Sequence, residues 1–181
     1  IASIVGALVQ GLAKGPMVSA TLATLFSWGI GLAAAVIIGS ITGFFLAIFP
    51  RVDDAVRPTL EFVRPIPSVA LIPIAIMALG IGMGMQISLI FFASVWPVLF
   101  ATRQGVLSLE PRHDEVARIA GLNGVERALR VALPGTLPSI ATGTRIAASI
   151  ALALSITVEM LTGRPGLGQL LQETRLSGFA A

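Results

Sequence analysis

Charged residues are missing from long stretches of this chain, and short polar segments separate those stretches. No charge occurs from Gly15 to Pro50 or from Pro65 to Thr102, and only Arg145 interrupts the last apolar stretch before Glu159. A helix that rises about 1.5 Å per residue needs roughly 20 apolar residues to cross the hydrocarbon of a bilayer. The pattern therefore predicts membrane-spanning helices.

The second uncharged stretch is too long for one crossing, because as a single helix it would measure roughly 57 Å, nearly twice the hydrocarbon thickness. Three glycines within Gly80–Gly84 favour a turn between two passes. Pro67 and Pro73 predict an irregular first pass, and Pro97 predicts a kink in the second. The four expected spans are Ala23–Ile48, Pro67–Leu79, Gln86–Gly105 and Pro138–Leu161.

The N-terminal quarter of the chain changes character along its length. Residues 1–13 hold too few apolar positions for a span, so we expect a short interfacial helix there. The first span, in contrast, is rich in small residues, which let helix backbones approach closely in lipid. These residues are Gly29, Gly31, Gly39, Ser40 and Gly43.

Composition supports a membrane protein, with 55% hydrophobic residues, 12% charged residues and a mean hydropathy of +0.93. The chain has no cysteine, which excludes disulfides and thiolate metal sites within it. Its 12 basic residues are mostly arginines in short loops, a pattern of membrane topology rather than of nucleic-acid binding. The loops at 51–64 and 103–130 carry these arginines, so we expect both loops to be cytoplasmic.

The polar segment EVARIAGLNGVERALRVALP, residues 115–134, predicts a helix, a turn and a second helix. Pro111 suits a first helical residue, and Gly121 ends that helix. Asn123 and Glu126 have the spacing of a capping box, and we expect the second helix to run until Pro134 stops it. Its apolar face would hold Val125, Leu129 and Ala132. Such a pair of helices either covers its own membrane helices or docks a soluble partner.

The same segment resembles the EAA loop of ABC-transporter permeases. That pattern is Glu, Ala, Ala, three residues, Gly, nine residues, then Ile, any residue, Leu, Pro. Val116 stands for the middle Ala and Val131 for the Ile. The residues that the resemblance assigns to ATPase coupling are Glu115, Val116, Ala117, Arg118, Gly121, Leu133 and Pro134.

Residues 64–84, 144–160 and the Gly-Leu-Gly at 166–168 resemble the permease branch for nitrate, taurine and sulfonates. The resemblance implies an all-α, polytopic membrane helical bundle, with 1–181 as one transmembrane permease domain and 109–135 as its cytoplasmic coupling loop. It also implies a further span on each side, so we expect the chain to be a fragment. The implied location is the prokaryotic cytoplasmic (inner) membrane.

The resemblance also implies the partners. Two permease chains, expected to form a homodimer in the lipid bilayer, would line a pathway for a small anionic solute. A cytoplasmic ABC ATPase would bind the ATP, so the chain itself would need no cofactor, and an extracytoplasmic binding protein would deliver the solute.

Two ionisable residues lie inside the last apolar span, where a charge must face protein or water. Arg145 and Glu159 are candidates for the pathway or a gate, together with Met83 near the glycine turn. In the alternative structural role, Arg145 would bond carbonyls or extend to the interface, and Glu159 would cap a helix near the outer surface. No metal site is expected, because His113 is the sole histidine.

Other functions fit the sequence less well. An intramembrane enzyme would need a nucleophile with a base, or paired carboxylates, at membrane depth. A secondary transporter or channel would explain the broken span and the buried charges, but not the helix pair with its fixed glycine and proline spacing. No GxxxxGK[ST] phosphate loop occurs in the chain, so we expect no ATPase site of its own.

Overall fold

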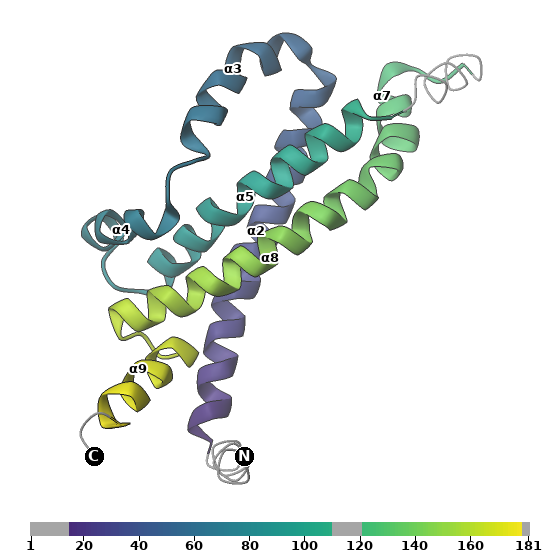
Figure 1. The fold of residues 1–181 in the computed structure, drawn as a ribbon. Helices are drawn as coiled ribbons and strands as arrows, with labels where there is room; N and C mark the ends of the chain where they lie inside the picture. The colour runs from purple at the N-terminus through teal and green to yellow at the C-terminus, as the bar shows by residue number, and fades with distance from the viewer. Residues whose placement is uncertain (1–14, 110–120, 179–181) are drawn as a thin grey trace.

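The computed structural model describes residues 15–109 and 121–178, and every regular element within these ranges is helical. Three long helices, α2 (Pro16–Ile48), α5 (Met83–Leu107) and α8 (Leu133–Thr162), pack side by side as the body of the molecule (Figure 1). The shorter elements are α3 (Pro50–Val63), a 3-10 turn η1 (Ser68–Leu71), α4 (Ile72–Leu79), α7 (Gly124–Arg127), a π turn η2 (Ala128–Ala132) and α9 (Leu167–Gly178). The predicted all-α bundle is confirmed.

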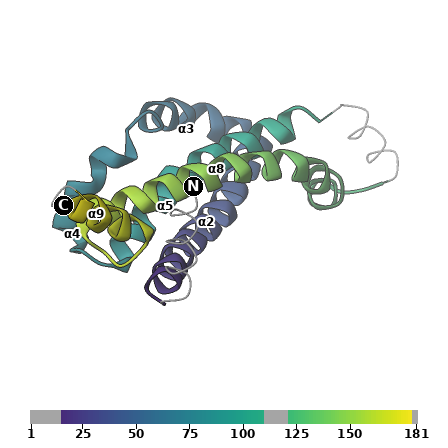
Figure 2. The same cartoon turned by 60° about the horizontal axis from the view of Figure 1, so that its bottom comes forward.

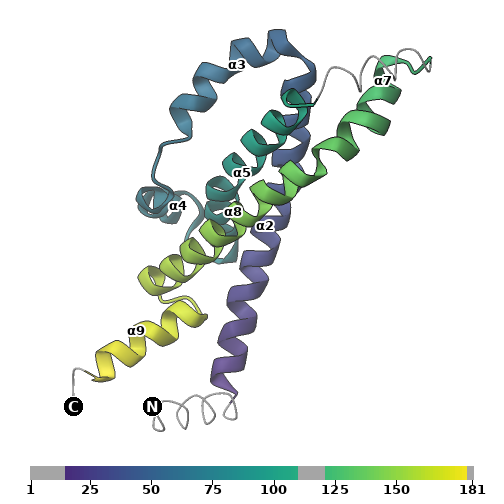
Figure 3. The ribbon, with the colours of Figure 1, turned by 45° about the vertical axis from the view of Figure 1, so that its right-hand side comes forward.

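The body has two distinct ends. α7 lies at one end, and α9 lies at the other beside the start of α2 (Figures 1 and 2). α2 ends at the α7 end, where α3 begins, and α5 runs back toward that end from the level of α4 (Figure 3). We call these the α7 end and the α9 end.

Three helices are long and apolar enough to cross a membrane: Met17–Ile48, Met83–Leu107 and Gly124–Thr162. A fourth crossing is present if α3 and the η1–α4 pair, which meet at 80°, form one broken span. The first and last helices extend beyond the predicted boundaries, and α2 with its 33 residues measures about 50 Å. The predicted fourth span stays a prediction.

The glycine turn between the two central passes is confirmed. Gly80 ends α4 with φ +71°, a backbone conformation that a residue with a Cβ rarely adopts. Gly82 is extended and precedes Met83, the first residue of α5. α5 then continues as one helix through Pro97.

Small residues on α2 bring its backbone against α5, as the sequence predicted. A Cβ at Gly43 would lie within 3 Å of the Leu99 carbonyl oxygen, and one at Gly31 would overlap the Ile90 side chain. Gly39 similarly faces the Val95 carbonyl. Gly29 has no neighbour within 4 Å of such a Cβ, so it does not take part in this packing.

α5 supplies the centre of the core. Met85 and Leu89 pack with Leu154 and Val158 of α8 near the α9 end. Farther along, a second cluster joins all three long helices and consists of Leu32, Ile90, Val98, Ala147 and Ala151. The elements that carry polar side chains are thus fixed around a packed apolar centre.

Residues 50–63 form a helix where the sequence predicted an arginine-bearing loop. Pro50 occupies the first helical turn, and Asp53, Val56 and Leu60, spaced three and four residues apart, lie on one face of α3. Val56 and Leu60 line an apolar groove with Leu99 of α5. The arginine count did not reveal this helix, whose half-buried residues Val56 and Leu60 are turned toward α2 and α5.

The prediction that Pro134 stops the second loop helix is wrong. α7, the π turn and α8 run on as one helix, Gly124–Thr162. In the π turn, the Leu133 N–H bonds to the Ala128 carbonyl five residues back. The wider turn shifts the carbonyls that the Pro134 ring would otherwise meet, so the helix continues through this proline.

Candidate functional site

The structure describes the second half of the predicted coupling loop, which begins with a glycine of positive φ and a capping box. Gly121 has φ +76°, as expected of a glycine that ends a helix. The Asn123 side chain accepts from the Glu126 N–H at 2.9 Å, and the Asn123 N–H donates to the Glu126 carboxylate at 3.1 Å. The predicted capping box is confirmed. Glu115, Val116, Ala117, Arg118 and His113 lie outside the described residues.

Apolar side chains of this segment point away from the chain. Val125 is 69% exposed and Leu129 is 56% exposed, while Ala132 and Leu133 are half-buried and Pro134 is exposed. Val125 and Leu129 therefore do not cover the membrane helices of their own chain, which was one of the two predicted roles of the loop. An exposed apolar face next to a polar one is typical of a docking surface.

The two ends of the loop are clamped together. Gly105, near the end of α5, lies so close to α8 that a Cβ there would overlap the side chains of Ser139 and Thr136. Thr136 is fully buried, and its hydroxyl bonds to the Ala132 carbonyl at 2.7 Å. A force on the loop would therefore reach α5 and α8 together.

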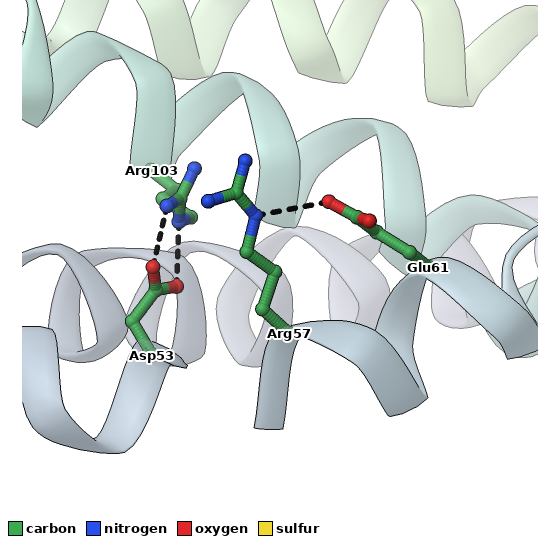
Figure 4. Close-up of polar contacts among 4 residues, drawn as sticks. All are labelled: Asp53, Arg57, Glu61 and Arg103. Carbon is green, nitrogen blue, oxygen red and sulfur yellow. Dashed lines mark hydrogen bonds and ion pairs between the residues drawn. The ribbon is translucent and has the colours of Figure 1, made fainter. Parts of the chain in front are cut away.

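A buried ion pair links α3 to the same end of α5. Arg103 donates from Nε to Asp53 Oδ1 at 2.6 Å and from Nη2 to Oδ2 at 2.5 Å, as Figure 4 shows. Both side chains are largely buried. Such two-point pairing fixes orientation as well as distance. The sequence indicates Arg103 only as a topology signal and does not reveal its partner Asp53.

A second pair in Figure 4 differs in its surroundings. Arg57 Nε lies 2.9 Å from Glu61 Oε1, and both side chains are more than half exposed. An exposed pair one helical turn apart contributes a few tenths of a kcal/mol. Of the two pairs in Figure 4, only Asp53–Arg103 joins two helices.

The three candidate pathway residues differ in their exposure to the surroundings. Arg145 is exposed on α8, and no ion pair to it is present in the described part of the chain. Met83 is half-buried at the start of α5. Glu159 is fully buried within the chain, so its carboxylate faces neither a pathway nor lipid in this conformation.

Four donors surround the Glu159 carboxylate. Oε1 accepts from Gln86 Nε2 at 2.9 Å and from the Ser155 hydroxyl at 3.3 Å. Oε2 accepts from the Thr24 hydroxyl at 2.9 Å and from the Gly168 N–H at 3.0 Å. We call these five residues the Glu159 cluster. No basic side chain forms an ion pair with Glu159 among the residues described, so hydrogen bonds alone satisfy the carboxylate.

The cluster explains the Gly-Leu-Gly at 166–168. A Cβ at Gly166 would overlap the Glu159 carboxyl group, and one at Gly168 would overlap the Ile156 carbonyl. The Leu167 N–H donates to Thr24 Oγ1 at 2.9 Å. The carboxylate thus caps the start of α9, where the helix dipole favours a negative charge. This arrangement matches the capping alternative for Glu159, whose link to the two glycines is not evident from the sequence.

Three long apolar helices, a bent helix pair and a capped polar segment at one end define a polytopic helical membrane protein. Residues 35–180 match the family model for the binding-protein-dependent transport system inner membrane component. The chain belongs to this family, and the predicted resemblance to ABC-importer permeases is confirmed. Membership also confirms a multi-pass protein of the inner membrane.

Curated relatives lie in the same branch. The chain is 30% identical to the nitrate import permease protein NrtB of Leptolyngbya laminosa, over 86% of the chain and 56% of that protein. It is 34% identical to the bicarbonate transport system permease protein CmpB of Synechocystis sp., over 82% and 53%. It is 32% identical to the taurine transport system permease protein TauC of Escherichia coli, over 79% and 52%. The chain therefore spans about half the length of these relatives.

We expect Asp53→Asn to destabilise the protein by about 3 kcal/mol, because it leaves the buried Arg103 guanidinium without its charged partner. Glu61→Gln is the matched control, and its cost should stay below about 0.5 kcal/mol. Thermal unfolding of both purified variants in detergent measures the difference. Equal midpoints for the two variants would contradict a bracing role for the Asp53–Arg103 pair.

Proposed function

We propose that the protein carrying this chain is the permease subunit of an ATP-driven importer, and that residues 109–135 couple it to a cytoplasmic ABC ATPase. The observation that carries the proposal is the capped segment with Val125 and Leu129 exposed between two clamped membrane helices. Family membership supports it. The chain would bind no ATP itself, because the partner subunit holds the nucleotide.

The geometry supports a mechanical role for this segment. α7, the π turn and α8 form one helix, so a displacement at Val125 would pass into the membrane without a flexible joint. The close contact of Gly105 with α8 would carry α5 along, and the Asp53–Arg103 pair would carry α3. Closure of two ATPase subunits on ATP would thereby move several membrane helices as rigid elements.

We further propose that two copies of the protein line the pathway and that a binding protein delivers the solute from outside. Arg145 is the residue on which this proposal rests. A guanidinium within a membrane span costs at least about 2.5 kcal/mol if it faces lipid. Its exposed position on α8 therefore favours contact with a second copy or with water in a pathway.

A fixed positive charge in such a pathway suits a small anion. The names of the relatives refer to nitrate, bicarbonate and taurine, each of which has an anionic group. A planar guanidinium can bind carboxylate-like or sulfonate oxygens through two parallel hydrogen bonds. The proposed solute class is therefore a small oxyanion such as nitrate, bicarbonate, taurine or another sulfonate.

Replacing Gly121 should weaken capture of the ATPase. Gly121→Ala forces a Cβ into the left-handed conformation, which costs roughly 1–2 kcal/mol and disfavours the native backbone at the start of the capped segment. Gly124→Ala is the matched control, because neither glycine has an atom within 4 Å of a Cβ and only Gly121 has a positive φ. The measurement is pull-down of the ATPase by the full-length protein in detergent.

The same assay includes Glu115→Arg, which reverses a charge in the motif. We expect native protein and Gly124→Ala to retain the ATPase, and Gly121→Ala and Glu115→Arg to retain less. Membrane insertion is checked for each variant by its yield in the membrane fraction. Failure of the native protein to retain any ATPase would contradict the proposed function.

Replacing Arg145 should lower solute uptake without loss of the ATPase. In proteoliposomes with the ATPase and binding protein, Arg145→Gln should reduce uptake of the transported anion by about tenfold or more, the effect of one lost charge-assisted contact. Arg145→Lys should retain part of it. Arg175→Gln on α9, also exposed, is the control. Native uptake by Arg145→Gln would remove this residue from the pathway.

A further inference from the structure

We infer that Glu159 is a positioning residue for transport, because its carboxylate fastens α9 to the three long helices so that the α9 end moves as one rigid body. The consequence for transport rests on the proposed function. The rigid connection itself does not, and it is argued from the cluster alone.

Each carboxylate oxygen is shared between two elements. Oε1 joins Gln86 of α5 to Ser155 of α8, and Oε2 joins Thr24 of α2 to Gly168 of α9. A carboxylate offers about four acceptor positions, and all four are filled. Separation of any one element would leave a fully buried carboxylate with an empty acceptor position.

Each hydrogen bond of the Glu159 cluster has a defined donor and acceptor. Every group around the carboxylate donates, and the two N–H groups of Gln86 are both used, one on Glu159 and one on Ser155 Oγ at 2.9 Å. The Gln86 Oε1 atom is buried and has no partner. The amide orientation therefore follows from the acceptors in the cluster. A glutamine at position 159 would replace one carboxylate oxygen by an NH2 group. That group would face two donors and could accept from neither.

Close packing makes the connection rigid. The start of α9 reaches Glu159 because Gly166 and Gly168 lack a Cβ, so backbone and carboxylate are in direct contact. Thr24 is fully buried and bonds on both sides, to Glu159 Oε2 and to the Leu167 N–H. α9 is thus attached to α2 and α8 by close contacts at Gly166, Leu167 and Gly168.

The Glu159 cluster lies at the opposite end of the Gly124–Thr162 helix from the coupling segment, and this position suggests its role in transport. The Gly124–Thr162 helix runs from the coupling segment at the α7 end to Glu159 at the α9 end (Figure 3). A movement that enters at Val125 would reach the cluster along this helix. Because the cluster holds α9 and the start of α2, both would follow α8 and reshape the far end of the pathway.

The test measures the distance between α2 and α9 directly. Spin labels at Leu22→Cys and Leu171→Cys, both on exposed positions, report it by pulsed electron paramagnetic resonance in the full-length protein. Labelled protein is diluted with unlabelled protein so that single copies are measured. We expect a narrow distribution in the native background, unchanged by Glu173→Gln on α9, and a broad or shifted one in Glu159→Gln. A native distribution in Glu159→Gln would overturn the inference.

An exchange of the two polar side chains tests the hydrogen-bond pattern. In the double variant Gln86→Glu and Glu159→Gln, the new amide oxygen faces Thr24 and Gly168 while its N–H groups face the new carboxylate and Ser155. We expect this exchange to restore the narrow distribution. A distribution as broad as in Glu159→Gln alone would contradict the assigned pattern.

Transport is then measured on the same variants with the ATPase and binding protein. We expect Glu159→Gln to retain the ATPase but to lower uptake per ATP hydrolysed by about tenfold or more, and the exchange to recover it. Unchanged uptake per ATP in Glu159→Gln would overturn the role in transport. If the native protein imports no solute while the distances behave as expected, the proposed function fails and the rigid connection stands.

Discussion

The fold depends on a carboxylate that is buried near the end of a membrane helix and is satisfied entirely by hydrogen bonds. In lipid, the hydrophobic effect does not hold helices together, so association relies on close packing and on polar contacts between helices. Glu159 supplies those contacts at the α9 end, where it bonds to α2, α5 and α9 and also to its own helix. Because this carboxylate has four donors around it, its burial tightens the bundle at this end.

The two ends of the bundle use different chemistry. At the α7 end, the Asp53–Arg103 ion pair and the capping box at Asn123 fix elements that adjoin the loop. Between the ends, glycines bring α2 against α5, and apolar side chains of α5 fill the centre. A rigid centre with one clamped end is the arrangement that a permease needs if a push on its loop is to change the opposite end of a pathway.

Local chemistry was readable from the sequence. The apolar stretches, the turn at Gly80–Gly84 and the Asn123–Glu126 capping box each depend on residues that are neighbours in the chain, and the structure confirms them. The helix at 50–63 was missed because the spacing of the residues that it turns toward α2 and α5 leaves no signal in a charge count. The helix through Pro134 was missed because a π turn cannot be read from a proline alone.

The polar contacts between elements were the least predictable part. Glu159 was selected as a buried charge, but its partners lie far away in the sequence, 135 residues for Thr24 and 73 for Gln86. Asp53 and Arg103 are 50 residues apart, and only Arg103 was counted, as a loop charge. Only the packing of the helices decides which distant polar groups meet, and the requirement that buried polar groups find partners then explains each pair.

The most direct test of the coupling claim uses the absence of cysteine from this chain. Val125→Cys is introduced into the full-length protein, with any cysteine outside this chain replaced by serine, and is labelled with a maleimide in the presence and absence of the ATPase subunit, with Leu171→Cys at the α9 end as control. We predict rapid labelling of Val125→Cys without the ATPase, protection when the ATPase is assembled, and no change at Leu171→Cys. Equal labelling of Val125→Cys with a demonstrably assembled ATPase would contradict docking at this segment.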